Sequence, residues 1–330
     1  MSVKTFLDLV EIKTKLASLT PFVIGVLFTL SYFNEFHVGN TVIFFIGMLC
    51  FDMATTAINN YMDFRKAKSE EYKYTENVVG REHIPEKLVQ QIIFGFIFIA
   101  FLVGMYLSYK TGWLLLVMGC LCCFIGVFYT FGPVPLSRMP LGELFSGVTM
   151  GLGIFAMVIY INIYQSKVLW LQLSLKSGHF ALTGNLWTVL AVIWASIPMI
   201  CTIANIMLAN NLCDLDQDIE NHRYTLPYYI GRQNGVFLFN ILMYLCFITL
   251  TIGLFLGLYH WTILLIWAVF PIIRENLIQF SKKQIKRETF SISIKNLIVF
   301  NGAYALCLLL VPILLTMMKS LQKEASFFIQ

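Results

Sequence analysis

The sequence predicts an all-α membrane protein with nine transmembrane helices in a single domain over residues 1–330. Three observations predict it: few charged residues, nine apolar stretches, and an uneven distribution of Lys and Arg between the connecting segments. Only 12% of the residues are charged and 58% are hydrophobic, whereas a soluble domain carries about 25% charged residues. This composition argues against a water-soluble enzyme, a disordered protein and a nucleic-acid-binding protein. The partner expected over most of the surface is the lipid bilayer.

Nine stretches approach or reach the length that a membrane span needs, which is about 20 apolar residues. In chain order they cover residues 16–33, 41–61, 88–108, 112–130, 142–164, 188–210, 236–256, 259–279 and 296–318. The eighth is the weakest, because Arg274 and Glu275 lie near its end. In the fifth, Gly147 and Gly151 form a GxxxG pair, which favours close packing between helices.

The basic residues predict the orientation of these spans. If the N-terminus is inside, the inner segments are the N-terminal stretch, loops 62–87, 131–141 and 211–235, and the region 274–295. They hold 18 of the 23 Lys and Arg residues. Because inner loops are enriched in Lys and Arg, we expect a cytoplasmic N-terminus and an external C-terminus in a cell-membrane protein. The outer loop 165–187 is polar, and the basic stretch 282–287 is expected to contact lipid head groups.

The second cytoplasmic loop opens on an acidic motif, Asn210-Asn211-Leu212-Cys213-Asp214-Leu215-Asp216-Gln217-Asp218. Asn210, Asp214 and Asp218 are spaced i, i+4, i+8, so on a helix they share one face. A row of carboxylates at the end of a span is costly unless a cation binds it. Two oxygen ligands per ion, with water and phosphate completing the shell, are typical of Mg²⁺.

A matching pair lies at the cytoplasmic end of the second span. Asn59 and Asp63 are also spaced i, i+4. We therefore predict that the two Asn-xxx-Asp elements are two halves of one Mg²⁺ site. The predicted metal ligands are Asn59, Asp63, Asn210, Asp214 and Asp218, and the three aspartates are the predicted catalytic residues.

Asp52 is the carboxylate that lies well inside a predicted span. On a helix, Asp52 and Thr56 share the face that carries Asn59 and Asp63. An intramembrane acid normally faces a bundle interior or a cavity. Two interpretations remain open: a cavity residue that binds substrate, or a polar side chain satisfied by packing.

These motifs resemble the two aspartate-rich motifs of the UbiA superfamily of intramembrane aromatic prenyltransferases, in its 1,4-dihydroxy-2-naphthoate polyprenyltransferase branch. The resemblance covers about residues 10–320. Four further stretches also resemble this branch of the family. They are Lys13-Thr14 with Pro21, Tyr129-Thr130-Phe131-Gly132-Pro133 with Gly142-Glu143, Asn221-His222-Arg223-Tyr224-Thr225, and Gly231-Arg232.

The resemblance implies nine helices around a central cavity that opens to the cytoplasm. It implies Mg²⁺-dependent transfer of a polyprenyl group from polyprenyl diphosphate to 1,4-dihydroxy-2-naphthoate, with loss of CO₂, giving demethylmenaquinone in menaquinone biosynthesis. Mg²⁺ neutralises the diphosphate leaving group and basic side chains assist. The candidates for binding the diphosphate are Lys13, Arg81, Arg138, Arg223 and Arg232. The aromatic ring expected in the acceptor cavity is that of Tyr129, since a ring face attracts an allylic cation. The alternative for Tyr129 is a tyrosine of the membrane–water interface.

This chain departs from the family pattern at three places. Ala67 stands where the first motif usually has another aspartate, so Glu70, Glu71 or neither completes the metal shell. Asn60 replaces an acid found in many members, and Cys213 replaces an arginine. Two other functions stay open: prenyl transfer to another acceptor such as 4-hydroxybenzoate, and an ion-coupled secondary transporter. Transporter acids usually lie near the midplane, whereas most acids here cluster at the cytoplasmic ends.

Overall fold

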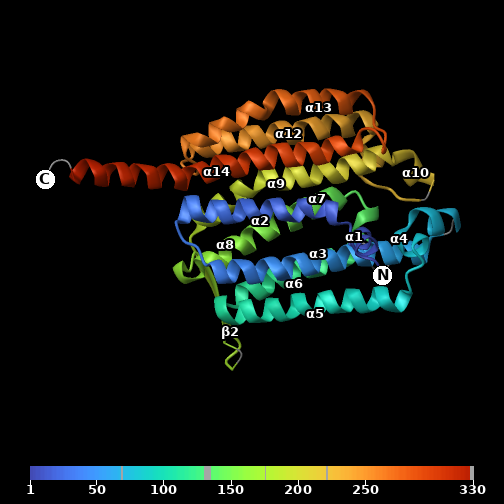
Figure 1. Cartoon of the computed structure of the whole chain (residues 1–330), viewed down its shortest axis with the longest axis horizontal. Helices are drawn as coiled ribbons and strands as arrows, with labels where there is room; N and C mark the ends of the chain where they lie inside the picture. The colour runs from blue at the N-terminus through green and yellow to red at the C-terminus, as the bar shows by residue number, and fades with distance from the viewer. Residues whose placement is uncertain (68–69, 130–134, 175, 221, 328–330) are drawn as a thin grey trace.

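The computed structural model describes residues 1–67, 70–129, 135–174, 176–220 and 222–327. Long helices run side by side to form one bundle (Figure 1). Large apolar side chains such as Phe94, Phe98 and Leu121 point outward and are more than half exposed. Such an apolar outer surface suits lipid rather than water.

The elements of the N-terminal half run in this order: α1 (Val3–Leu9), η1 (Ile12–Lys15), α2 (Leu16–Phe28), η2 (Thr29–Phe33), α3 (Val38–Lys66), η3 (Tyr72–Glu76), α4 (Val78–Arg81), α5 (Glu86–Thr111), α6 (Trp113–Phe128), η4 (Leu136–Arg138), α7 (Gly142–Ser146), η5 (Gly147–Ile154), α8 (Phe155–Ile163) and η6 (Tyr164–Ser166). The C-terminal half follows with β1 (Leu169–Ser174), β2 (His179–Gly184), α9 (Leu186–Cys213), α10 (Leu215–Glu220), α11 (Leu226–Ile230), α12 (Arg232–Phe255), η7 (Trp261–Val269), α13 (Phe270–Lys282) and α14 (Phe290–Phe327).

Eight segments within the described ranges are long and apolar enough to cross a membrane. They correspond to eight of the nine predicted stretches, including the weak eighth one, Trp261–Lys282. The remaining stretch is α6, which has 16 residues, fewer than the roughly 20 of a full span. The multi-span helical fold is therefore confirmed, and the count of nine stays a prediction.

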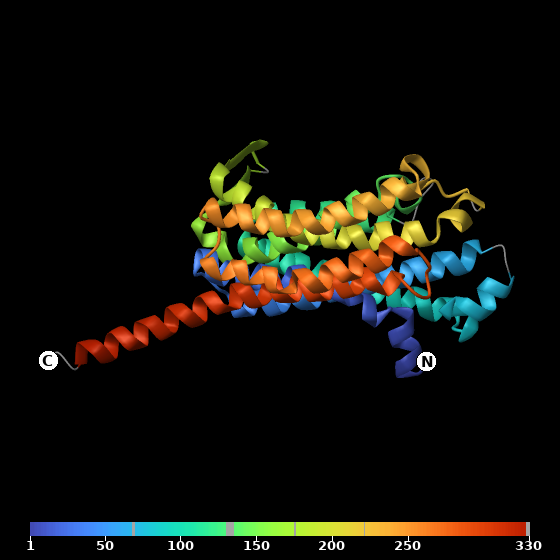
Figure 2. The same cartoon turned by 90° about the horizontal axis from the view of Figure 1, so that it is seen from above.

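The two ends of the bundle differ. The N-terminus, α1, α4 and α10 gather at one end, and the C-terminus and β2 lie at the other (Figures 1 and 2). A polar loop was expected over residues 165–187, but the structure forms an antiparallel hairpin there, pairing Leu169 with Gly184 and Leu171 with Leu182. Gly178 supplies the positive φ (+70°) that its turn requires. The hairpin is the one exception to an all-helical chain among the described residues.

Close packing fixes α9, the helix that leads to the second motif. A Cβ atom on Gly151 would lie 2.6 Å from the backbone nitrogen of Ile200, and one on Gly147 would lie 2.7 Å from its carbonyl oxygen. The GxxxG pair therefore lets η5 and α9 touch backbone to backbone, as its spacing predicts. On the C-terminal side, fully buried aromatic rings such as Phe239 of α12 and Phe300 of α14 pack in the same core as α9.

Candidate active site

The second motif begins on the last turn of α9 and continues onto α10. The backbone N–H of Asp214 donates to the carbonyl of Asn210 (3.1 Å), and that of Asp218 donates to the carbonyl of Asp214 (2.8 Å). Although the helix is interrupted at Asp214, these two i+4→i bonds keep the three residues in helical succession. The backbone therefore places Asn210, Asp214 and Asp218 on successive helical turns, as the i, i+4, i+8 spacing predicts.

Each aspartate of the second motif has its own basic partner. Asp214 Oδ2 lies 2.5 Å from Lys286 Nζ, and the same ammonium donates to Asn210 Oδ1. Asp216 pairs with Arg232 at 2.8 Å. Asp218 Oδ1 lies 3.2 Å from Arg223 Nη1. The acidic row is thus balanced by three cations from three different segments.

Arg223 is held firmly against the motif. Its backbone N–H donates to the carbonyl of Asp218 (2.7 Å), and its guanidinium donates to the carbonyl of Ser137 (3.2 Å). The second bond connects the loop after α10 to η4, which ends at Arg138. Arg223 Nε is buried and has no partner among the described residues. A donor is thus left free to bind a further acceptor.

The first motif lies on the last turns of α3, one continuous helix through Lys66. Asn59 and Asp63 therefore keep their i, i+4 spacing on one face. The neighbouring residue Asn60 makes structural contacts instead, since its amide donates to the carbonyl of Leu9 (2.9 Å) and to Glu11 (3.2 Å). Asn60 ties the N-terminal segment to α3, so its departure from the acidic family pattern has a structural use.

Arg138 and Arg223 connect the two motifs electrostatically. Both guanidinium groups act on the carboxylate of Asp63 on α3, and both also act on that of Asp218 on α10. Burial raises the pKa of the Asp218 carboxyl, and Arg223 opposes that rise. Two motifs far apart in sequence are therefore within electrostatic range of the same two arginines.

The donor set fits a hard divalent cation. The carboxylates and amides of the two motifs offer only oxygen ligands, which Mg²⁺ prefers. Asp218 Oδ2 is buried and has no hydrogen-bond partner in the described part of the chain. No group of three His, Cys, Asp or Glu side chains there gathers closely enough to hold a metal ion. The set fits the usual Mg²⁺ shell of one or two carboxylates completed by water and phosphate.

Two other residues of the predicted set lie elsewhere. Arg81 on α4 lies 3.7 Å from Asp8 and 3.2 Å from Glu82, and no contact with the motifs is observed among the described residues. Arg232 binds Asp216 and the carbonyl of Leu212, at the edge of the second motif. Of the described basic candidates, only Arg138 and Arg223 act electrostatically on aspartates of both motifs. The side chain of Lys13 lies outside the described residues, as do residues 130–134 and Asn221.

Glu70 and Glu71, the candidates for completing the first motif, are both exposed. They follow the end of α3, beyond residues 68–69, which are not described. Their role as metal ligands stays a prediction.

Tyr129 lies at the wall of the site, directly after α6. Its hydroxyl is 3.5 Å from the carbonyl oxygen of Gly142, and it interacts with Arg223 and Glu143. Glu143 is 5% exposed and accepts a bond from Asn211 (2.8 Å), while its other carboxylate oxygen has no partner among the described residues. Tyr129 is thus adjacent to both the second motif and its arginine.

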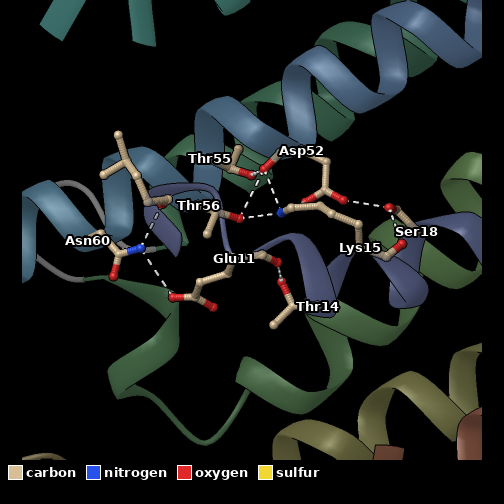
Figure 3. A network of polar contacts seen from close by, with 9 residues as sticks. Glu11, Thr14, Lys15, Ser18, Asp52, Thr55, Thr56 and Asn60 are labelled. Atoms are coloured by element: carbon tan, nitrogen blue, oxygen red, sulfur yellow. Dashed lines mark hydrogen bonds and ion pairs between the residues drawn. The ribbon is translucent and has the colours of Figure 1, made fainter. Parts of the chain in front are cut away.

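Asp52 and Thr56 form a closed polar network with the start of α2, shown in Figure 3. Lys15 Nζ donates to Asp52 Oδ1 (2.7 Å) and to Thr56 (2.5 Å), and Ser18 donates to Asp52 Oδ2 (2.5 Å). The Lys15 side chain is 7% exposed. These contacts are those of satisfied polar packing, and a role of Asp52 in binding the acceptor stays a prediction.

Three residues near the site were not predicted from the sequence. The basic stretch 282–287 indicated a lipid contact for Lys286, but this side chain reaches Asn210 and Asp214 across the fold. Lys15 contributed only to the predicted orientation, although its position just before a span allows it to pair with an intramembrane acid. Glu143 lies in a stretch that carries the family resemblance, and its place at the start of a span is the signal that could have identified it.

Comparisons with known proteins identify relatives of this chain. The 1,4-dihydroxy-2-naphthoate octaprenyltransferase of Bacillus subtilis (strain 168) is 28% identical over 228 residues, which are 68% of this chain. The match spans 65% of that relative's length, slightly under two thirds.

Solved structures show the same fold. The apo UbiA homologue of Aeropyrum pernix K1 has a TM-score of 0.66 at 13% identity, covering 88% of this chain and 96% of its own. The Archaeoglobus fulgidus UbiA homologue bound to GPP and Mg²⁺ has a TM-score of 0.61 at 12% identity, covering 93% and 99%. The model of the UbiA prenyltransferase family matches residues 18–297. This chain therefore belongs to the UbiA prenyltransferase family, whose members are enzymes that transfer prenyl groups.

Proposed function

We propose that this enzyme transfers a polyprenyl group from a polyprenyl diphosphate to 1,4-dihydroxy-2-naphthoate, with Mg²⁺, and releases CO₂ and diphosphate to give demethylmenaquinol, the hydroquinone form of demethylmenaquinone. The observation that carries the proposal is that Arg223 pairs with Asp218 of the second motif at 3.2 Å, while Arg138 and Arg223 both act electrostatically on Asp218 and on Asp63 of the first motif. The Bacillus relative, named a 1,4-dihydroxy-2-naphthoate octaprenyltransferase, supports the choice of acceptor.

The oxygen donors of the two motifs would hold the metal. The carboxylates of Asp63, Asp214 and Asp218 are the main ligands, with the amide oxygens of Asn59 and Asn210 beside them. When bound, Mg²⁺ neutralises the negative charge that grows on the departing diphosphate. Binding of GPP and Mg²⁺ by the Archaeoglobus homologue supports this assignment.

Arg138 and Arg223 would bind the diphosphate oxygens and orient the donor. The unpartnered Nε of Arg223 is a free donor for a phosphate oxygen, and guanidinium groups suit phosphate because they donate in a planar fork. The lipid tail would remain among the apolar helices. Holding both substrates in one place lowers the barrier by proximity and orientation.

The bond changes follow from the acceptor's chemistry. The allylic C–O bond breaks, and its electron pair leaves with the diphosphate. The ring carbon that carries the carboxylate attacks the prenyl carbon, so the ring loses aromaticity. Loss of CO₂ from that carbon restores it. Tyr129, with its hydroxyl near Gly142, would present its ring to the allylic cation.

We further propose that the site opens to the cytoplasm of a cell-membrane protein. The N-terminus, α4 and α10 lie at the same end of the bundle, opposite the hairpin and the C-terminus (Figure 1). The end that carries the motifs is also the end with the basic loops, which supports a cytoplasmic N-terminus and an external C-terminus.

The decisive experiment uses naphthoate labelled in its carboxyl group, with purified enzyme, geranyl diphosphate and Mg²⁺. We expect one labelled CO₂ for each prenyl group transferred, and no product when EDTA removes the metal. For 4-hydroxybenzoate, attack beside the hydroxyl expels a proton, so its carboxylate would stay. A prenylated naphthoate that keeps the label would refute the decarboxylating reaction. Product from 4-hydroxybenzoate alone would move the assignment to another acceptor.

A further inference from the structure

Lys286 lies in the short connection between α13 and α14 and reaches the end of α9. Its ammonium is shared by two oxygens of the second motif, Asn210 Oδ1 and Asp214 Oδ2, with 2.5 Å to the latter. Both oxygens are among the proposed metal ligands. A lysine ammonium and a metal ion therefore require the same lone pairs.

The connection is built to aim this side chain inward. The backbone N–H of Ile285 donates to Thr289 Oγ1 (2.9 Å), and that of Thr289 donates back to the carbonyl of Ile285 (2.8 Å). Gln284 donates to the carbonyl of the fully buried Phe280 (2.7 Å). The turn is thus anchored on both sides of Lys286, which places its Nζ at the motif.

The remaining contacts of Lys286 allow it to leave. Its side chain is 44% exposed, so water can replace lost contacts at low cost. Its ammonium also lies 5.0 Å from the ring centroid of Phe290, and a lysine stem with four carbons rotates freely. Within the motif, no other cation can take the place of the Lys286 ammonium, because Cys213, which lies between Asn210 and Asp214, is uncharged.

We propose that Lys286 is an exchangeable cation of the second motif. It neutralises Asp214 and donates a hydrogen bond to Asn210 while no metal is bound, and it moves to the diphosphate oxygens once metal and donor enter. The proposal rests on the proposed function, because it assigns those oxygens to the metal. A bound diphosphate adds negative charge next to a displaced ammonium, so the new position is favoured by a charge-assisted hydrogen bond.

Two opposite effects of one substitution test this exchange. In Lys286→Gln, the competing ammonium is absent, so Mg²⁺ alone should bind about two- to fivefold more tightly, the fold-change of one partly exposed ion pair. Geranyl diphosphate in saturating Mg²⁺ should bind about tenfold more weakly, because one charged hydrogen bond is lost. Both constants are measured by calorimetry on the purified full chain.

Lys283→Gln is the matched control. Lys283 lies in the same connection but pairs with Glu288 at 3.0 Å, so both affinities should equal those of the wild type. The inference is overturned if Lys286→Gln matches this control, or if Mg²⁺ binds it more weakly. A wild-type protein that binds neither Mg²⁺ nor geranyl diphosphate would instead overturn the proposed function, and the exchange with it.

Discussion

Two lysine–aspartate pairs occur in this protein in different settings. Lys15 and Asp52 are 2.7 Å apart, with side chains 7% and 16% exposed. Lys286 and Asp214 are 2.5 Å apart, with side chains 44% and 20% exposed. The chemistry of the two pairs is the same, so the difference between them comes from burial and from their other partners.

The buried pair is completed by two neutral hydroxyl groups, of which Ser18 donates and Thr56 accepts. Ser18 and Lys15 both donate to the carboxylate of Asp52, and Thr56 accepts from Lys15. The network joins the start of α2 to the middle of α3 (Figure 3). Removing one member of a buried pair leaves an uncompensated charge and costs about 3–5 kcal/mol. A more exposed pair contributes about 0.2–1 kcal/mol. Breaking the first pair therefore destabilises the fold strongly, and the second pair is free to serve binding.

The largest expected effect comes from breaking the buried pair. Lys15→Met should lower the free energy of unfolding by about 3 kcal/mol or more, because Asp52 keeps its charge without a cation. The double variant Lys15→Met/Asp52→Leu should recover most of this loss, since apolar side chains can replace a buried pair at little cost. Denaturant unfolding in detergent, followed by circular dichroism, measures both.

Lys286→Met serves as the comparison and should change the free energy of unfolding by less than about 1 kcal/mol. Equal losses for Lys15→Met and Lys286→Met would contradict the distinction between the two pairs. A double variant as unstable as Lys15→Met would show that the network, rather than the uncompensated charge, sets the cost.

The next effect is on catalysis. Asp214→Ala removes a metal ligand from the exposed pair, so turnover at saturating Mg²⁺ should fall by about 10²–10³-fold. The unfolding midpoint should hardly move, because Asp214 lies at a polar helix end and Lys286 can be hydrated. Asp63→Ala and Asp218→Ala should behave alike. Near-normal turnover in any two of the three variants would refute the shared metal site.

The comparison also shows what the sequence could predict. The helical spacing within each motif was predictable, because i and i+4 residues of one helix share a face whatever surrounds it. The membrane fold was predictable from the apolar stretches for the same local reason. The hairpin at 169–184 depends on pairing between two segments, and it was not predicted. The α6 helix lies within the predicted stretch 112–130, although it is shorter than a full span.

The partners of the motifs depended on long-range packing. Lys286 is 72 residues from Asp214 in sequence, and Lys15 is 37 residues from Asp52. Five basic residues were candidates for the diphosphate, and their type alone could not show that Arg138 and Arg223 act on aspartates of both motifs. Only the arrangement of η4 and the loop after α10 decides that.

The smallest expected effect is at the acid between the two predicted ligands. Asp216 is 86% exposed on its side chain and pairs with Arg232 at the rim, so Asp216→Ala should change the free energy of unfolding by less than about 1 kcal/mol. Turnover should stay within about twofold of the wild type, because Arg232 keeps its bond to the carbonyl of Leu212 (3.3 Å). Steady-state assays of Asp214→Ala, Asp216→Ala and Asp218→Ala under one set of conditions make the comparison. If Asp216→Ala lost as much turnover as Asp214→Ala and Asp218→Ala, the position of an aspartate on the helix would not decide whether it binds the metal. The motif would then act through its total negative charge rather than through three oxygens aligned by consecutive turns.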